Sequence, residues 1–163
     1  MKKLIYYSED IMCMSDVRGR KIKVESNVPF SFYYSARNSS HGPRVKVVSD
    51  PNRMHISIAS NLSLVGDWRF TQNRNADRLS SSEIAQIKNF FKRYLVMLLL
   101  VWDSHCYDEA SFRDYLECEI DLQEFISQLN FYPEYSDILD TVTSVKELEQ
   151  VCRENNLVNF YGN

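Results

Sequence analysis

The chain has 163 residues, of which 44% are hydrophobic and 13% aromatic, and its net charge at pH 7 is −3. This composition can fill a core and excludes wholesale disorder, while only four glycines and four prolines exclude a collagen-like or low-complexity chain. The longest apolar run, Tyr94 to Trp102, is far shorter than the roughly 20 residues that a membrane-spanning helix needs, and no signal peptide is apparent. We therefore expect a cytoplasmic protein with no membrane contact.

The charge is divided unevenly between the two halves of the chain. Residues 1–80 hold 13 Lys and Arg against 7 Asp and Glu, a net charge of +6, whereas residues 81–163 hold 6 against 15, a net charge of −9. The two halves can attract each other, or each can face its own partner. Net acidity argues against non-specific nucleic-acid binding by the whole chain, but not against binding by the first half.

Alternating apolar and polar residues predict a series of short strands in the first third of the chain. The predicted strands cover residues 3–7, 21–25, 30–35, 44–48 and 54–59. In the third of them the alternation places Phe32 and Tyr34 on the buried face. The last two are joined by a short turn and predict an antiparallel hairpin. Residues 61–78 are predicted to be irregular, with Trp68 anchoring this segment against the core.

The strongest local pattern is a helix over residues 80–102. Ser80 and Glu83 form a capping box at its start, and Leu79 and Ile84 stand where a hydrophobic staple would close the first turn. Apolar residues then recur every three or four positions and form one stripe. Beyond Tyr94 the helix is apolar all round, so we expect its second half to be buried on every side.

Residues 103–163 are acidic and predict further short helices. This segment carries 14 Asp and Glu against 3 Lys and Arg. Asp121 with Glu124, and Ser144 with Glu147, have the spacing of helix N-caps, and Pro133 interrupts the pattern between them. We expect residues 157–161 to form a last strand or a docking tail.

Together these patterns predict an α+β fold. Its antiparallel sheet has about four strands, is packed by one long central helix, and is followed by an acidic helical C-terminal extension. We expect residues 1–103 to form the sheet and central helix, and residues 104–163 to pack on the same core, because about 60 residues are marginal for independent folding.

Residues 30–103 carry a resemblance to a known group of proteins. The residues concerned are Phe32-Tyr33-Tyr34, the segment His41-Gly42-Pro43-Arg44-Val45-Lys46-Val47, and Leu-Leu-Leu-Val-Trp-Asp at 98–103. They resemble a family of small bacterial proteins of unknown function that have a His-x-Pro strand motif and are often encoded beside toxin–antitoxin genes. Arg44 and Lys46 stand where that family has its second and third histidines, so the resemblance does not imply a histidine cluster here.

Two surfaces are candidate binding sites. The first is the open face of the sheet, where cations and an aromatic residue can bind nucleic-acid phosphates and stack on bases. Its predicted residues are Tyr33, Arg37, His41, Arg44, Lys46 and His55. The second is an acidic surface for a protein partner, with predicted residues Glu117, Glu119 and Glu124. In the alternative interpretation both faces are simply solvated, or the acidic helices cover the basic sheet face.

Catalysis has little support in the sequence. No phosphate-binding glycine loop, zinc-protease motif or nucleophile elbow is present. The four cysteines are widely spaced, which predicts reduced structural thiols, and we expect no metal site and no cofactor.

Three functional hypotheses remain open. The first is a small cytosolic regulatory or accessory protein of toxin–antitoxin type, which acts by binding a macromolecule. The second is an inhibitor encoded by a phage or mobile element, whose acidic surface blocks a host defence nuclease. The third is a ribonuclease-like toxin in which His41 and His55 move protons.

Overall fold

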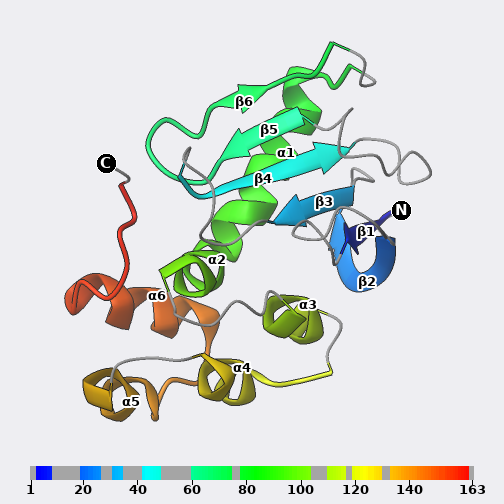
Figure 1. The fold of residues 1–163 in the computed structure, drawn as a ribbon. Helices are drawn as coiled ribbons and strands as arrows, with labels where there is room; N and C mark the ends of the chain where they lie inside the picture. The colour runs from blue at the N-terminus through cyan, green and yellow to red at the C-terminus, as the bar shows by residue number, and fades with distance from the viewer. Residues whose placement is uncertain are drawn as a thin grey trace.

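The structure, a computed structural model, describes residues 3–8, 19–26, 31–34, 42–48, 60–74, 78–103, 110–116, 119–129 and 133–161. Its strands are β1 (Lys3–Ser8), β2 (Gly19–Ser26), β3 (Ser31–Tyr34), β4 (Arg44–Val48), β5 (Ser60–Ser63) and β6 (Phe70–Thr71). Its helices are α1 (Ser81–Arg93), α2 (Leu95–Asp103), α3 (Ala110–Leu116), α4 (Leu122–Gln128), α5 (Pro133–Leu139) and α6 (Val145–Glu154). The predicted α+β class is therefore confirmed, with the strands preceding the helices (Figure 1).

The sheet differs from the prediction in size and in strand direction. Within the described residues it has six strands in the order β2-β1-β3-β4-β5-β6. The pair β1–β3 is parallel, and the other neighbouring pairs are antiparallel. The prediction of about four antiparallel strands was wrong because local alternation identifies strands but not their neighbours. β5 and β6 are short and lie in the segment predicted to be irregular. The predicted strand of residues 54–59 lies outside the described part of the chain.

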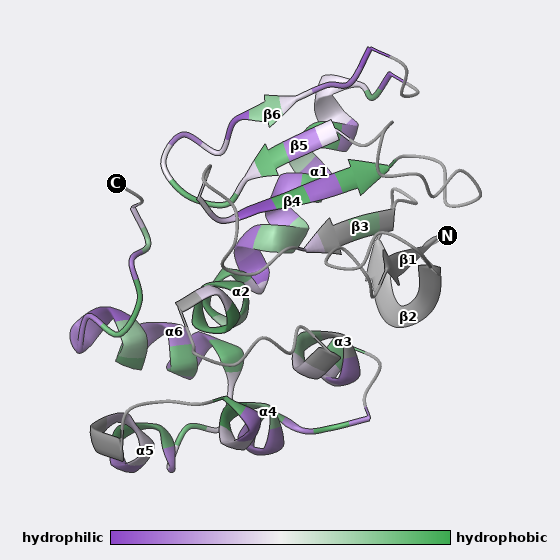
Figure 2. Ribbon diagram, in the orientation of Figure 1, coloured by the Kyte–Doolittle hydropathy of each residue, from purple (hydrophilic) through white to green (hydrophobic). Residues whose placement is uncertain are grey.

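The predicted alternation in the central strands is confirmed. Phe32 and Tyr34 in β3, Val45 and Val47 in β4, and Leu62 in β5 are all at most 1% exposed. They form the inner face of the sheet, against which α1 lies (Figure 1). The hydropathy colouring of Figure 2 shows the same alternation along β4.

The start of α1 agrees with the sequence. The Ser80 hydroxyl accepts a hydrogen bond from the Glu83 N–H at 3.2 Å, and the Glu83 carboxylate accepts one from the Ser80 N–H at 2.7 Å. This capping box satisfies backbone donors that a helix start otherwise leaves unpaired.

The predicted single helix is, however, broken at Tyr94. The Tyr94 N–H donates to the Phe91 C=O at 3.2 Å, which ends α1 with a tighter turn. The Tyr94 C=O then accepts the N–H groups of Met97 and Leu98, which begins α2. The chain turns at this point, so that α2 leaves the sheet face and passes toward the C-terminal helices (Figure 1). Neither glycine nor proline stands at the break, so no residue type marks it in the sequence.

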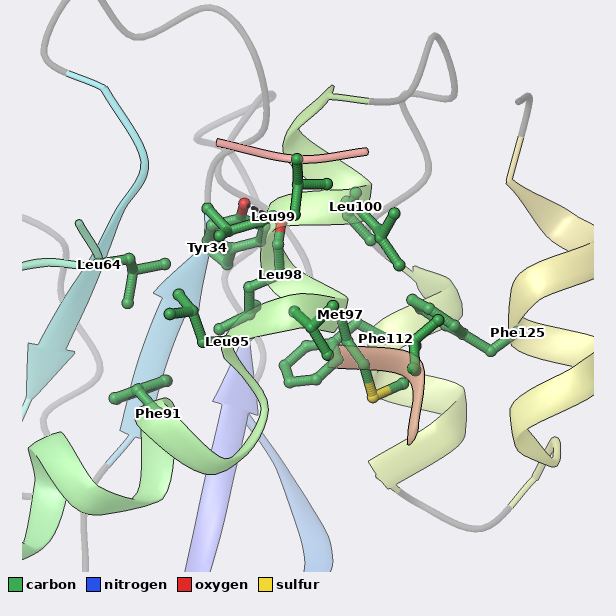
Figure 3. Close-up of a cluster of buried hydrophobic side chains, with 14 of the residues drawn as sticks. Tyr34, Leu64, Phe91, Leu95, Met97, Leu98, Leu99, Leu100, Phe112 and Phe125 are labelled. Atoms are coloured by element: carbon green, nitrogen blue, oxygen red, sulfur yellow. Dashed lines mark hydrogen bonds between the residues drawn. The ribbon is translucent and has the colours of Figure 1, made fainter. Parts of the chain in front are cut away.

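The predicted burial of the second half is confirmed. All residues from Leu95 to Val101 are at most 6% exposed. On the sheet side, the Tyr34 hydroxyl of β3 donates to the Leu98 C=O. On the other side, Met97 and Leu100 face Phe112 of α3 and Phe125 of α4 (Figure 3).

Two of the C-terminal helices, α4 and α6, begin where their caps predict. The Asp121 carboxylate accepts from the Glu124 N–H at 2.8 Å, and the Ser144 hydroxyl accepts from the Glu147 N–H at 3.1 Å. By contrast, the sequence did not predict α5. It begins at Pro133, and proline suits the first position of a helix because its missing N–H would have no partner there.

The last helix ends in a regular C-cap and leads into a docked tail. Asn156 adopts a positive φ of 52°, and the Leu157 N–H donates to the Cys152 C=O at 3.0 Å. Val158 and Phe160 are each 8% exposed, so residues 157–161 form a docking tail and not a strand.

One hydrophobic core joins the sheet to the C-terminal helices. The same cluster of buried side chains includes Phe32 of β3, Phe112 of α3, Leu148 of α6 and Phe160 of the tail. The predicted boundary at residue 103 stays a prediction. None of the described helices combines the length and the apolar character needed to cross a membrane.

Candidate nucleic-acid interface

The structure describes about half of the predicted site residues. Tyr33, Arg44 and Lys46 on the sheet, and Glu119 and Glu124 on the acidic surface, belong to the described part of the chain. Four others, Arg37, His41, His55 and Glu117, lie outside it. The ribonuclease hypothesis depends on His41 and His55, so it stays a prediction.

Strand register brings several of the described residues into one row across the sheet. Tyr33 in β3 pairs with Lys46 in β4, Lys46 pairs with Asn61 in β5, and Asn61 pairs with Thr71 in β6. Cross-strand partners share a face of a sheet. The row therefore belongs to the open face, opposite the buried Val45 and the face that packs on α1.

A second row runs beside the first. Arg44 in β4 pairs with Ser63 in β5, and the Ser63 N–H donates to the Arg69 C=O at 3.0 Å. Arg69 thus continues the ladder one position before β6 and belongs to the same face as Arg44. The sequence prediction missed Asn61, Ser63 and Arg69, since it left their segment irregular; the partial alternation of Leu62 and Leu64 with polar residues was the available signal.

The two cations of β4 lie in an unfavourable electrostatic environment. Arg44 and Lys46 are both partly buried. Burial lowers the pKa of Lys46, and the neighbouring charge of Arg44 lowers it further. Neither cation has a carboxylate partner among the described residues. The ion pair within the described part of the chain joins Arg153 and Glu149 of α6, at 2.8 Å. The open face therefore holds cationic charge that nothing described neutralises.

Asn61, the cross-strand partner of Lys46 on β5, has an unsatisfied polar atom. Its Oδ1 is buried and accepts no hydrogen bond. A buried acceptor without a donor costs about 1–3 kcal/mol of stability. The open face therefore carries a second feature that lowers stability, next to Lys46.

We expect Asn61→Val to raise the free energy of unfolding by about 1 kcal/mol, because it removes this acceptor and introduces a residue that favours strands. Urea denaturation followed by circular dichroism measures the change. Thr71→Val, at the exposed partner position on β6, is the matched control and should change stability by less than about 0.5 kcal/mol. Equal effects of the two substitutions would show that strand preference alone is responsible.

The acidic helices do not cover the described part of the open face. Glu119 and Glu124 are exposed near the start of α4. Figure 1 shows α4 and α5 at the opposite end of the molecule from β4, β5 and β6, and α6 beside α2. The predicted use of Glu119 and Glu124 as a protein-binding surface stays a prediction, and so does the nuclease-inhibitor hypothesis that depends on it.

Among the described residues there is one cysteine, and its environment is that of a structural thiol. Cys152 is fully buried, and burial together with the nearby Glu149 raises its pKa to about 12. The thiol is therefore protonated and weakly nucleophilic at neutral pH. In the same part of the chain, no three His, Cys, Asp or Glu side chains gather closely enough to hold a metal ion.

Comparison with known protein families, with curated proteins and with solved structures finds no match for this chain. The resemblance of residues 30–103 to small toxin–antitoxin-associated proteins therefore stays a prediction. The described geometry defines an α+β protein whose mixed sheet packs on one face and carries unpaired cations on the other.

Proposed function

We propose that this chain is a small regulatory or accessory protein of toxin–antitoxin type that acts by binding, and that its open sheet face binds a nucleic-acid strand. One observation carries the proposal. Arg44 and Lys46 are neighbouring cations on the same face of β4, they are partly buried, and they have no carboxylate partner in the described part of the chain.

Two cations held close together favour an anion between them. Residues two apart on a strand are separated by about 6.6 Å, so one phosphate group can contact both side chains. Binding a phosphate would remove the repulsion that lowers the pKa of Lys46. It would also replace the water that partial burial has displaced from the ammonium group.

The neighbouring strand supplies an aromatic residue in the right position. Tyr33 is the direct cross-strand partner of Lys46. Proteins that bind single-stranded nucleic acid combine cations for the backbone with aromatic rings for the bases, and each stacked base contributes about 1–3 kcal/mol. The register of β3 against β4, which pairs Tyr33 with Lys46, supports the proposal.

The net charge of −3 does not oppose this proposal, because the charges are segregated in space. The acidic helices α4 and α5 lie at the far end of the molecule from β4, β5 and β6 (Figure 1). The potential near a surface depends on the charges within about 8 Å at physiological salt, so the open face attracts anions even though the whole chain is acidic.

The proposal predicts salt-sensitive binding that depends on β4. We expect a fluorescein-labelled single-stranded RNA to bind at low salt, measured by anisotropy, and its affinity to fall steeply as salt rises. Arg44→Gln with Lys46→Gln should weaken binding at least about tenfold, because each lost phosphate contact removes part of the electrostatic free energy. Lys146→Gln, an exposed lysine on α6, is the control and should change the affinity by less than about twofold.

Two results would contradict the proposal: no binding by the wild-type protein at low salt, or equal losses in the β4 and Lys146 variants. The second result would mean that binding follows net charge and not the sheet face. Circular dichroism of each variant verifies that the fold is retained.

A further inference from the structure

We infer that the bound nucleic acid is a single strand that crosses the sheet from β3 toward the β6 edge, with Arg69 as a third phosphate contact. This inference rests on the proposed function, and it names the path and the class of the ligand. Arg69 belongs neither to a strand predicted from the sequence nor to the predicted binding residues.

The ladder between β5 and β6 places Arg69 on the open face. Leu62 pairs with Phe70, and the Ser63 N–H donates to the Arg69 C=O, so Ser63 stands opposite Arg69. Ser63 also pairs with Arg44 on its other side. Arg44 and Arg69 therefore lie in one row on either side of Ser63, whose small side chain leaves room for a backbone to pass over it from one cation to the other.

The position of Arg69 is fixed by the tight loop that precedes it. Gly66 has a φ of 71° and Trp68 a φ of 54°, both in the left-handed region. The Asp67 carboxylate accepts the Arg69 N–H at 3.2 Å. A non-glycine residue with positive φ is uncommon and costs about 1 kcal/mol or more, so this loop holds its shape through its surroundings.

Contacts with α1 supply that support. The Trp68 ring packs against the core, and the Lys92 ammonium of α1 lies 5.3 Å from its centroid. Cation–π contacts of this kind contribute about 0.5–1 kcal/mol at exposed sites. The loop is thereby held between the sheet and the helix, while the Arg69 side chain itself is exposed.

The distances suit one strand of nucleic acid. Neighbouring strands lie about 4.8 Å apart, so the two strand steps from Arg44 to Arg69 cover about 10 Å, and the three steps from Tyr33 to Thr71 cover about 14 Å. At about 3.4 Å per stacked nucleotide, this width corresponds to about three or four nucleotides, at the lower end of the range of about 4–16 that small sheet-based domains cover. β6 ends the sheet and has only two residues, so a longer strand leaves over this edge (Figure 1). The ribbon on both sides of β6 is hydrophilic (Figure 2).

A charged residue beside a sheet edge also has a simpler explanation. Cations next to an edge strand discourage pairing with another chain. That role requires no nucleic acid, and it predicts that Arg69 affects aggregation but not binding.

The experiment measures binding of oligouridylates of about 4, 8 and 12 nucleotides by anisotropy. We expect Arg69→Gln to weaken binding of all three oligonucleotides about fivefold, because even four nucleotides span the distance from Arg44 to Arg69, and to lower the slope of log K against log salt by about 0.7. Arg78→Gln, at an exposed arginine that precedes α1, is the matched control. It should leave the affinity for oligonucleotides of every length unchanged. The same measurements with oligothymidylates and with a duplex separate RNA, single-stranded DNA and double-stranded ligands.

The outcomes separate this inference from the proposed function. If Arg44→Gln with Lys46→Gln weakens binding but Arg69→Gln behaves like wild type at every length, the sheet face binds nucleic acid and the path toward β6 is wrong. Equal or tighter binding of the duplex also overturns the inference. If the wild-type protein binds no oligonucleotide at low salt, the proposed function and the inference both fall.

Discussion

Phe32→Ala is expected to lower the free energy of unfolding by about 3–5 kcal/mol, which is enough to unfold a marginally stable domain. Phe32 is fully buried in β3 at the point where the sheet meets two helices. Its ring centroid lies 5.0 Å from that of Phe91 in α1 and 6.5 Å from that of Phe112 in α3. Alanine would leave a cavity that three separate elements would have to close together.

Urea denaturation followed by near- and far-ultraviolet circular dichroism measures this loss. Tyr161→Ala is the control, since Tyr161 is 78% exposed and its loss should change stability by less than about 0.5 kcal/mol. Phe32→Leu should lose less than Phe32→Ala, because it keeps much of the apolar volume. A loss below about 1 kcal/mol for Phe32→Ala would show that the three elements do not share one core.

Deleting residues 104–163 is expected to leave a fragment that aggregates. Met97 and Leu100 of α2 face Phe112 and Phe125 of the deleted helices (Figure 3), and the fragment would expose them to water. The other side of α2 stays covered, because the Tyr34 hydroxyl donates to the Leu98 C=O. An exposed apolar patch of this kind promotes association.

Size-exclusion chromatography and binding of a hydrophobic dye test the 1–103 fragment against the full chain. Replacing Met97 and Leu100 with glutamate should make the fragment more soluble, whereas the same change in the full chain should destabilise it by burying unpaired charge. A monodisperse, folded 1–103 fragment would contradict the arrangement, and would mean that α2 needs no cover from the C-terminal helices.

The open face was predicted only in part, because its rows of residues depend on the pairing between strands. Alternation in β4 identified Arg44 and Lys46 directly, since Val45 and Val47 between them are apolar. Arg69 could not be assigned to the same face, because its position depends on a hydrogen bond to Ser63 in another strand. Only the register of β5 against its neighbours brings Arg44 and Arg69 into one row.

Features that depend on near neighbours along the chain follow from the amino-acid sequence alone. The Ser80–Glu83 capping box and the helix starts at Asp121 and Ser144 were predicted correctly, because the groups that bond lie within one helical turn. The burial of residues 95–101 was predicted correctly as well, because a helix segment that is apolar on every side can be stable only inside a core.

Other features depend on contacts between segments that are distant in the sequence. The parallel pairing of β1 with β3, the break at Tyr94 and the separation of the acidic helices from the open face have no local sequence pattern. Each is the outcome of competition between alternative packings of the same apolar surfaces, whose free energies differ through long-range contacts. A helix of residues 80–102 was locally favourable, yet the chain turns at Tyr94 because its second half gains more by packing between the sheet and the C-terminal helices.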